Sequence, residues 1–216
     1  MIRLLFVGDG DRDAATVPRL VEEILGLGVT AVTRPWKENP HLHGKSVPHA
    51  PRGYARRLMY AVRVALDHGL NGVVATVDRD KEKPRSRLAK LKKGRDFDRE
   101  KGLSFPTALG EANPHSEAWL LDDFVAVRKA LGLPKEVKIP TVSKTDDPKK
   151  ALNKLMDQSP REMASEHRRL QLLGAIAANV TPNRCAHAKK TGFDAFTKDV
   201  RQELGEISHP RLTRDI

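Results

Sequence analysis

The centre of the chain contains the stretch Val73-Val74-Ala75-Thr76-Val77-Asp78-Arg79-Asp80. A continuous run of apolar and β-branched residues is typical of a strand that is buried on both faces of a parallel sheet. Acidic residues at the carboxyl end of such a strand lie where open α/β sheets bind their ligands. Two carboxylates one residue apart point to opposite sides of an ideal strand, but both can reach a cation where the chain turns. We therefore interpret Asp78 and Asp80 as part of a divalent-metal site.

Strand and helix patterns alternate around this central stretch. Residues 4–7 and 29–33 predict strands, and the apolar stripe within residues 14–27 predicts an amphipathic helix between them. A helix over residues 53–68 leads into the central strand, and residues 103–109 predict a further strand after it. This order is typical of βαβ units. It indicates an α/β fold with a mostly parallel, Rossmann-like sheet that is flanked by helices.

The second part of the chain has no strong strand pattern after Gly132. A helix is expected over residues 117–131, with Trp119 in the core rather than as a platform for a nucleic-acid base. We divide the chain into an α/β domain, residues 1–134, and a helical C-terminal extension, residues 135–216. Within the extension, helices are expected at residues 148–158, 162–179 and 194–204.

The net charge favours a polyanionic partner. The 216 residues include 39 Lys and Arg against 28 Asp and Glu, which gives a formal net charge of +11 and a pI of about 9.9. Lys and Arg gain affinity for nucleic acids by displacing counterions from the phosphates. Nucleic acid is therefore the expected partner, and the alternative is a protein that is merely basic.

The most basic segment spans residues 81–101. It could hold a phosphate backbone near the acidic residues, and Lys81 or Lys83 could neutralise charge in a transition state. The alternative is a solvated charged face. The candidate nucleic-acid-binding residues are Lys83, Arg85, Arg87, Lys90, Lys92, Lys93 and Arg95.

The single cysteine, Cys185, excludes an internal disulfide and a zinc cluster of thiolates. It is typical of a reducing compartment, so we expect a cytoplasmic protein. The apolar start of the chain turns at Gly8-Asp9 too soon for a signal peptide, and no apolar run is long enough to span a membrane. We expect no membrane partner.

The first strand also ends in acidic residues. Asp9 follows the strand directly, and Asp13 lies in the first turn of the helix that comes next. Neighbouring parallel strands end at the same edge of a sheet, so these carboxylates could converge with Asp78 and Asp80. Hard oxygen ligands of this kind select Mg²⁺ or Mn²⁺. The alternative is that Asp11 and Asp13 only stabilise the helix N-terminus.

Three motifs, in this order, resemble the Toprim superfamily. Asp9-Gly10 ends the first strand with a second acid at Asp13, Asp78-x-Asp80 ends a later strand, and a third motif follows, Asn113-Pro114-His115-Ser116-Glu117-Ala118-Trp119-Leu120-Leu121. The sequence is most similar to a small stand-alone branch of unknown function, related to the OLD (overcoming lysogenization defect) nucleases. The resemblance covers about residues 4–123 and implies a Toprim-like fold.

The resemblance also implies metal-dependent phosphodiester chemistry with two ions, Mg²⁺ or Mn²⁺. By position, Asp9 replaces the glutamate that usually opens the motif, and its side chain is one carbon shorter. The implied metal ligands are Asp9, Asp13, Asp78, Asp80 and Glu117. The implied catalytic residues are Asp9, Asp78, Asp80 and Glu117, to which we add Lys81. His115 or Ser116 could orient a phosphate or a metal-bound water, and Ser116 could equally cap the helix that it precedes.

These observations predict a Mg²⁺- or Mn²⁺-dependent nuclease that acts on DNA or RNA. The resemblance adds an AAA- or ABC-type ATPase partner in a phage-defence system as a further expectation. One alternative is a protein that binds nucleic acid or a partner through a degenerate Toprim metal site. Another is a phosphotransfer enzyme that acts on a small nucleotide. The helical extension is a candidate for homodimerisation or for docking a partner.

Overall fold

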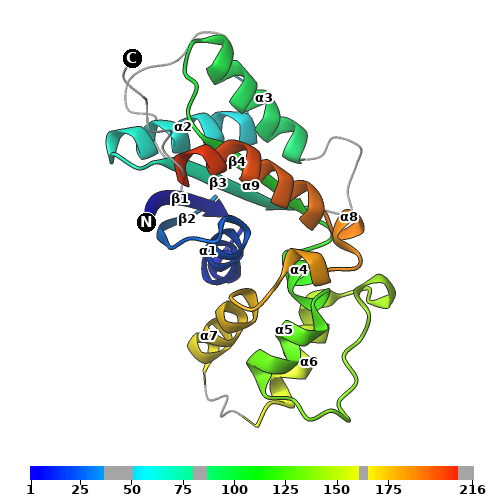
Figure 1. Ribbon diagram of the computed structural model, residues 1–216. Coiled ribbons are helices and arrows are strands. Elements are labelled where there is room, and N and C mark those ends of the chain that lie inside the picture. The colour runs from blue at the N-terminus through cyan, green and yellow to red at the C-terminus, as the bar shows by residue number, and fades with distance from the viewer. Residues whose placement is uncertain (37–50, 80–86, 161–164, 209–216) are drawn as a thin grey trace.

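The computed structural model describes residues 1–36, 51–79, 87–160 and 165–208. Within these residues a single sheet of four parallel strands has the order β2-β1-β3-β4 (Figure 1). The strands are β1 (Ile2–Gly8), β2 (Val29–Pro35), β3 (Gly72–Asp78) and β4 (Thr107–Ala112). The predicted α/β class, with a parallel sheet flanked by helices, is confirmed.

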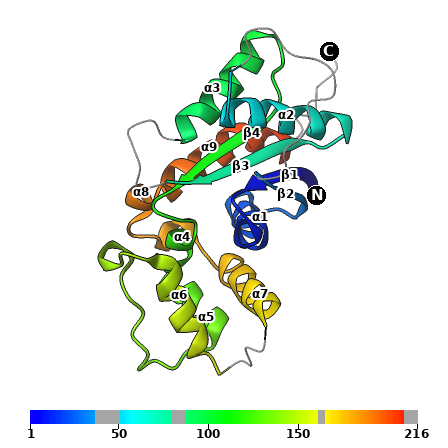
Figure 2. The same ribbon diagram turned by 180° about the vertical axis from the view of Figure 1, so that it is seen from behind.

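Helices cover both faces of the sheet. Figures 1 and 2 show one pair of helices on each side. One face packs against α1 (Asp11–Leu25) and α9 (Phe193–Ser208). The other face packs against α2 (Tyr54–Asp67) and α3 (Arg87–Glu100). The molecule therefore has three layers around the strands.

Alternation along the strands explains why both layers of helices can pack. Leu4 and Phe6 of β1 belong to the core under α1 and α9, whereas Leu5 and Val7 belong to the core under α2 and α3. Successive residues of a strand point to opposite faces, so a strand that is apolar throughout needs cover on both. β3 is buried from Gly72 to Val77 for the same reason.

Helices also make up the part of the chain that follows β4. They are α4 (Glu117–Leu121), α5 (Phe124–Leu131), α6 (Pro148–Asp157), α7 (Glu166–Ala177) and α8 (Ala188–Thr191), ahead of α9. Short 3-10 turns lie at Val142–Lys144 and Pro182–Arg184. None of the described residues beyond β4 forms a strand, in agreement with the helices expected there. No described helix has both the length and the apolar character that crossing a membrane requires.

The single helix that we predicted over residues 117–131 is wrong, because the chain breaks between α4 and α5. The carboxylate of Asp123 accepts a hydrogen bond from the backbone N–H of Ala126 at 3.0 Å and caps the start of α5. An aspartate satisfies the free N–H groups of a new helix better than it continues an old one. The apolar spacing alone did not reveal this break.

The helix α9 returns to the sheet and joins its core to that of the helical part. Trp119 is fully buried, as predicted, and its ring stacks on Phe196 with centroids 4.9 Å apart. A Cβ on Gly110 of β4 would lie 2.6 Å from the Phe196 ring, so the glycine makes room for it. One apolar core therefore runs from the sheet through α1 and α9 into α4–α7. The proposed domain boundary at residue 134 stays a prediction.

Candidate metal centre

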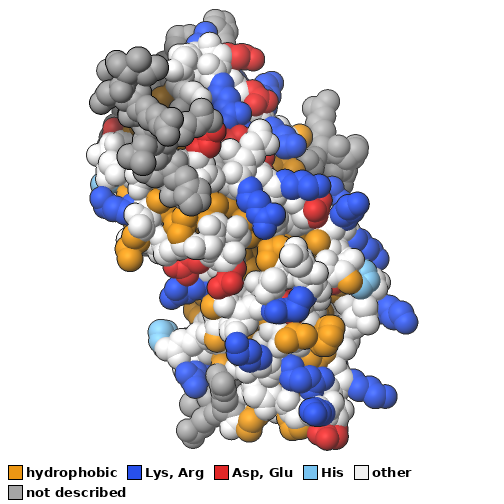
Figure 3. Space-filling model, viewed as in Figure 1, with side chains coloured by type: hydrophobic (Ala, Val, Ile, Leu, Met, Phe, Trp, Pro, Cys, Tyr) orange, Lys and Arg blue, Asp and Glu red, His pale blue; other side chains and the backbone are white. Residues whose placement is uncertain are grey.

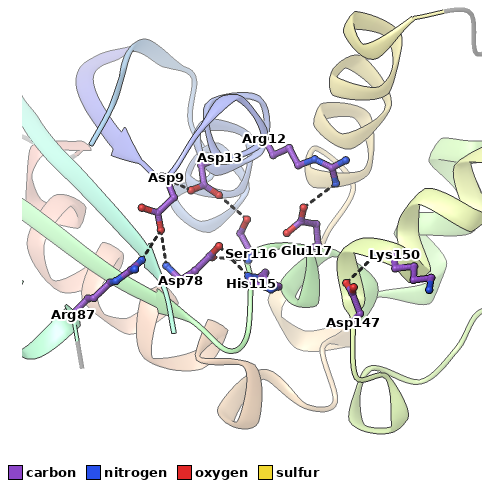
Figure 4. A network of polar contacts seen from close by, with 10 residues as sticks. All are labelled: Asp9, Arg12, Asp13, Asp78, Arg87, His115, Ser116, Glu117, Asp147 and Lys150. Carbon is purple, nitrogen blue, oxygen red and sulfur yellow. Dashed lines mark hydrogen bonds and ion pairs between the residues drawn. The ribbon is translucent and has the colours of Figure 1, made fainter. Parts of the chain in front are cut away.

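The strand order places two acidic residues at the position where open α/β sheets bind ligands. The chain moves from β1 outward to β2 on one side and from β3 outward to β4 on the other, so β1 and β3 flank the switch point. Asp9 follows β1 directly and Asp78 is the last residue of β3. Asp9 Oδ2 accepts a hydrogen bond from the backbone N–H of Asp78 at 3.0 Å (Figure 4). The predicted approach of these two strand ends is therefore present.

Asp13 brings a third carboxylate to the same place from the first turn of α1. Its Oδ2 accepts the backbone N–H of Asp9 at 2.8 Å, and its Oδ1 accepts the hydroxyl of Ser116 at 2.6 Å. The side chain is 6% exposed. A Cβ on Gly8 would lie 2.6 Å from the Asp13 Cβ, so only glycine lets α1 start this close to β1. Asp13 thus does more than stabilise the helix N-terminus.

The segment between β4 and α4 closes the site from the other side. His115 Nδ1 lies 3.1 Å from Asp78 Oδ2, and the backbone N–H of Ser116 donates to Asp78 Oδ1 at 3.2 Å. Ser116 precedes α4, but its side chain makes no capping hydrogen bond. The alternative that Ser116 caps the helix is wrong, because its hydroxyl donates to Asp13 instead.

The pKa values report how closely these carboxylates are packed. Burial raises the pKa of Asp13, and the hydrogen bonds from Ser116 and from the backbone of Asp9 oppose that rise. The pKa of Asp78 is raised to about 7, first by burial and then by the charge of Asp13, while His115 lowers it. Mutual repulsion without a compensating cation favours a proton, or a metal ion, at this position.

Glu117 faces an arginine. Its Oε1 lies 2.9 Å from Arg12 Nη1, and its side chain is 6% exposed. The other guanidinium nitrogen of Arg12 donates to Asn153 Oδ1 of α6 at 3.0 Å. Glu117 is close enough to Asp13 to raise its pKa. Sequence reasoning missed the pairing of Arg12 with Glu117, because the two residues are 105 positions apart and no local motif joins them.

Arg87, which we predicted to bind nucleic acid, lies at the edge of the carboxylate group. Its Nη1 is 3.4 Å from Asp9 Oδ2, and its guanidinium lies over the ring of Tyr54, 5.3 Å from the centroid. Because α3 begins at this residue, the basic helix starts at the site itself.

The remaining basic candidates are distributed differently. Lys90, Lys92 and Lys93 are exposed on α3, and Figure 3 shows Lys and Arg side chains spread over much of one face of the molecule. Arg95 contacts Asp199 at 2.9 Å and Glu203 at 3.3 Å on α9, with 11% of its side chain exposed. The other candidates, Asp80, Lys81, Lys83 and Arg85, lie outside the described residues.

A cleft of about 390 Å³ opens beside the carboxylates. On one side it is lined by Asp9, Gly10, Asp11, Arg12, Asp13, Asp78, His115, Ser116 and Glu117, and on the other by Lys149, Glu166 and Leu170 of α6 and α7. Sequence reasoning missed this second wall. No local motif marks these three residues, since they reach the cleft only through the packing of α6 and α7.

The donor set fits a hard divalent cation in its chemistry. Three carboxylates, Asp9, Asp13 and Asp78, supply oxygen ligands, and their crowding leaves negative charge that a cation would balance. Within the described part of the chain, no three His, Cys, Asp or Glu side chains surround a common point as metal ligands. Their oxygens instead accept hydrogen bonds from Ser116, Arg87 and nearby backbone groups.

Comparison with known proteins adds one structural likeness. No family model matches the chain, and no curated protein matches it. Among solved structures, the C-terminal region of the Burkholderia pseudomallei OLD protein aligns over 93% of this chain and 99% of that chain, with 14% identity and a TM-score of 0.36. At this identity and TM-score, the likeness does not establish a shared activity.

Proposed function

We propose that this protein is a Mg²⁺- or Mn²⁺-dependent nuclease of the Toprim type that hydrolyses phosphodiester bonds of DNA or RNA. The observation that supports it best is the convergence of Asp9, Asp13 and Asp78 at the switch point of a parallel sheet. The start of a basic helix at Arg87, beside the same carboxylates, gives the substrate's phosphates a place to bind.

Asp9, Asp13 and Asp78 would hold the metal, together with Asp80 and Glu117 of the motif resemblance. Bound there, a pair of divalent ions supplies an activated water and charge stabilisation for an in-line displacement. Glu117 would take part only after it exchanges its contact with Arg12, which lies 2.9 Å away.

The protein's own side chains have distinct roles in this proposal. His115 orients the carboxylate of Asp78 through the 3.1 Å contact, and Ser116 holds Asp13. Arg87 is placed to bind a phosphate oxygen, since its guanidinium already lies beside an anion. We keep Lys81 as a candidate for neutralising charge in the transition state.

Two other functions have specific support. A degenerate metal site in a binding protein is favoured by the lack, within the described residues, of three ligands around one point. A phosphotransfer enzyme for a small nucleotide is favoured by the cleft of about 390 Å³, because small-molecule sites have volumes of about 300–1,000 Å³. An ATPase partner and a role in phage defence stay part of the proposal by resemblance alone.

The test is cleavage of plasmid DNA, single-stranded DNA and RNA in the presence of Mn²⁺, Mg²⁺ or EDTA. We expect metal-dependent cutting that Asp78→Asn reduces by at least about a hundredfold. Asp67→Asn, at the exposed end of α2, is the matched control and should cut like the wild type.

Calorimetric titration with Mn²⁺ separates the alternatives. Metal binding without cutting of any polymer favours the small-nucleotide enzyme. A folded protein that neither binds Mn²⁺ nor cuts would refute the nuclease and leave the binding protein.

A further inference from the structure

We infer that Arg79 binds a phosphate of the nucleic acid next to the phosphate that is cleaved. The inference rests on the proposed function and narrows its substrate to polynucleotides. Arg79 stands between the two acidic residues of the Asp78-x-Asp80 motif. Its side chain is held by a buried glutamate, Glu111 of β4.

The backbone of Arg79 continues the sheet beyond the end of β3. Its N–H donates to the carbonyl oxygen of Ala112 at 2.7 Å, so the pairing of Asp78 with Ala112 extends by one residue. Successive residues of a strand point to opposite faces of the sheet. Because the Asp78 carboxylate faces Ser116 and the start of α4, the side chain of Arg79 lies on the other side, toward α3.

Glu111 determines where the guanidinium of Arg79 lies. The Oε2 atom of Glu111 accepts a hydrogen bond from Arg79 Nε at 3.1 Å, and its Oε1 accepts the backbone N–H of Leu88 at 3.3 Å. One carboxylate thus contacts both Arg79 and the residue that follows Arg87. Arg87 reaches Asp9 at 3.4 Å, as Figure 4 shows. The two arginines therefore lie near each other at the start of α3, beside the carboxylates of the metal centre.

The guanidinium of Arg79 presents donors to solvent. The side chain of Glu111 is 6% exposed, whereas that of Arg79 is 54% exposed. Within the described part of the chain, the hydrogen bond to Glu111 uses Nε, and neither Nη nitrogen of Arg79 has a hydrogen-bond partner. Guanidinium nitrogens in this planar arrangement suit two oxygens of one phosphate.

The alternative is that Arg79 only neutralises the charge of Glu111. Burying a carboxylate costs free energy, and an ion pair with a half-exposed arginine offsets little of that cost. A glutamine could accept the hydrogen bond from Leu88 without burying any charge. The negative charge of Glu111 is better explained by the cation that it orients at the surface.

Arg79 and the cleft lie on different sides of Asp78. The cleft extends toward α1, α6 and α7, whereas Glu111 and Arg79 lie on the side of α3. A phosphate at the carboxylates and a phosphate at Arg79 therefore belong to different nucleotides of one chain. A nucleoside monophosphate fills only one of these positions, so the contact with Arg79 favours a polymer.

The experiment measures binding of fluorescein-labelled oligothymidylate and oligouridylate by fluorescence anisotropy, with Ca²⁺ in place of Mn²⁺ to limit cutting. We expect Arg79→Gln/Glu111→Gln to bind the oligonucleotide that the wild type prefers about tenfold more weakly. The slope of log K against log salt should also fall by about 0.7, the contribution of one phosphate contact on a single strand. This double variant keeps the net charge of the wild type and leaves no buried carboxylate without its cation.

The matched control is Arg19→Gln/Glu22→Gln on α1. Arg19 is 56% exposed and its Nη1 lies 2.8 Å from Glu22 Oε2, while Glu22 Oε1 accepts the backbone N–H of Val29 at 3.1 Å. The affinity and the salt slope of this control should equal those of the wild type. Arg79→Lys keeps the charge without the planar guanidinium, so it should keep the wild-type slope with only part of the affinity.

The outcomes separate this inference from the proposed function. An unchanged affinity or an unchanged slope in Arg79→Gln/Glu111→Gln would overturn the phosphate contact, as would a wild type that binds neither oligonucleotide. Cleavage with Mn²⁺ then tests the nuclease on its own. A wild type that shows the expected binding but does not cut would refute the nuclease and leave the contact of Arg79 with a phosphate in place.

Discussion

Among single residues, Asp78 is the carboxylate whose charge changes near neutral pH. Its pKa rises from 3.8 to about 7 because the side chain is buried and because Asp13 lies close to it. Two hydrogen-bond donors, His115 and the backbone of Ser116, hold its oxygens in place. A proton and a metal ion therefore compete for this group, and metal binding should strengthen as the pH rises through 7.

The first prediction concerns the stability of the metal-free protein. Between pH 4 and pH 7, roughly, the native state keeps a proton on Asp78 that the unfolded chain has lost, so the free energy of unfolding falls as the pH rises through this window. Asp78→Asn removes that titration, and its stability should depend less on pH there. Urea denaturation in EDTA at several pH values measures the effect.

Asp67→Asn is the control for this experiment, since it removes an aspartate at the exposed end of α2. If the free energy of unfolding depended on pH equally in the wild type and in Asp78→Asn, the raised pKa of Asp78 would be contradicted. Some pH dependence of the free energy of unfolding should remain in Asp78→Asn, because burial also raises the pKa of Asp13.

At the scale of elements, close contacts between backbones set the position of the basic helix. A Cβ on Gly94 of α3 would lie 2.6 Å from the carbonyl oxygen of Ala55 on α2. An ion pair joins the same two helices, with Arg63 Nη2 of α2 lying 2.8 Å from Oδ1 of the buried Asp98 of α3. These contacts fix the exposed lysines of α3 relative to the carboxylates.

The second prediction tests this packing. Gly94→Ala places a methyl group against a backbone atom that cannot rotate away, so we expect the free energy of unfolding to fall by about 1–3 kcal/mol. Gly205→Ala makes the same change in α9, where nothing lies within 4 Å of the new Cβ. That control should be neutral or more stable by up to about 1 kcal/mol. Equal effects of the two substitutions would show that the contact with Ala55 is unimportant.

The elements that could be predicted from sequence are those with strong local patterns. The apolar run that ends at Asp78 predicted a strand that is buried on both faces. The pattern of the first strand and the next helix predicted the positions of Asp9 and Asp13. The helix α3 was not predicted, because its long polar sequence has few apolar positions and buries only Leu91, Gly94 and Asp98. Local patterns do not encode a helix whose position depends on one glycine contact and one ion pair.

At the scale of the whole molecule, the formal charge of +11 contrasts with a cleft lined by carboxylates. The exposed cations of α3 lie near this cleft, since the helix begins at Arg87. A polyanion is therefore attracted by the surface and reaches the carboxylates only where cations compensate its charge.

The third prediction is the salt dependence of nucleic-acid binding. Removing two phosphate contacts with Lys90→Ala and Lys93→Ala should reduce the slope of log K against log salt by about 1.4 for a single strand. Fluorescence anisotropy of a labelled oligonucleotide measures it, with Ca²⁺ in place of Mn²⁺ to limit cutting. Lys135→Ala with Lys138→Ala, also exposed, is the control pair. An unchanged slope in the α3 variant would exclude this helix from the binding surface.

Much of the candidate site could also be predicted from sequence, but its far side could not. Strand ends in a parallel sheet meet at one edge, so Asp9 and Asp78 were predictable neighbours. The ion pair of Glu117 with Arg12 and the wall formed by Lys149, Glu166 and Leu170 depend on how helices far apart in the sequence pack together. Tertiary packing of this kind leaves no periodicity in the sequence.

The position of α9 has a consequence for how the chain is made. Leu4, Val74 and Ala108 form the face of the sheet that Val200 and Leu204 of α9 help to cover. During synthesis, residues 193–208 leave the ribosome long after the strands have emerged. This face of the sheet therefore stays partly uncovered until α9 has been made. Contacts between distant parts of a chain form slowly, and apolar surface exposed meanwhile attracts chaperones or neighbouring nascent chains. Slowing translation of the stretch that encodes α9 should therefore lower the yield of folded protein more than slowing it within the stretch that encodes β1.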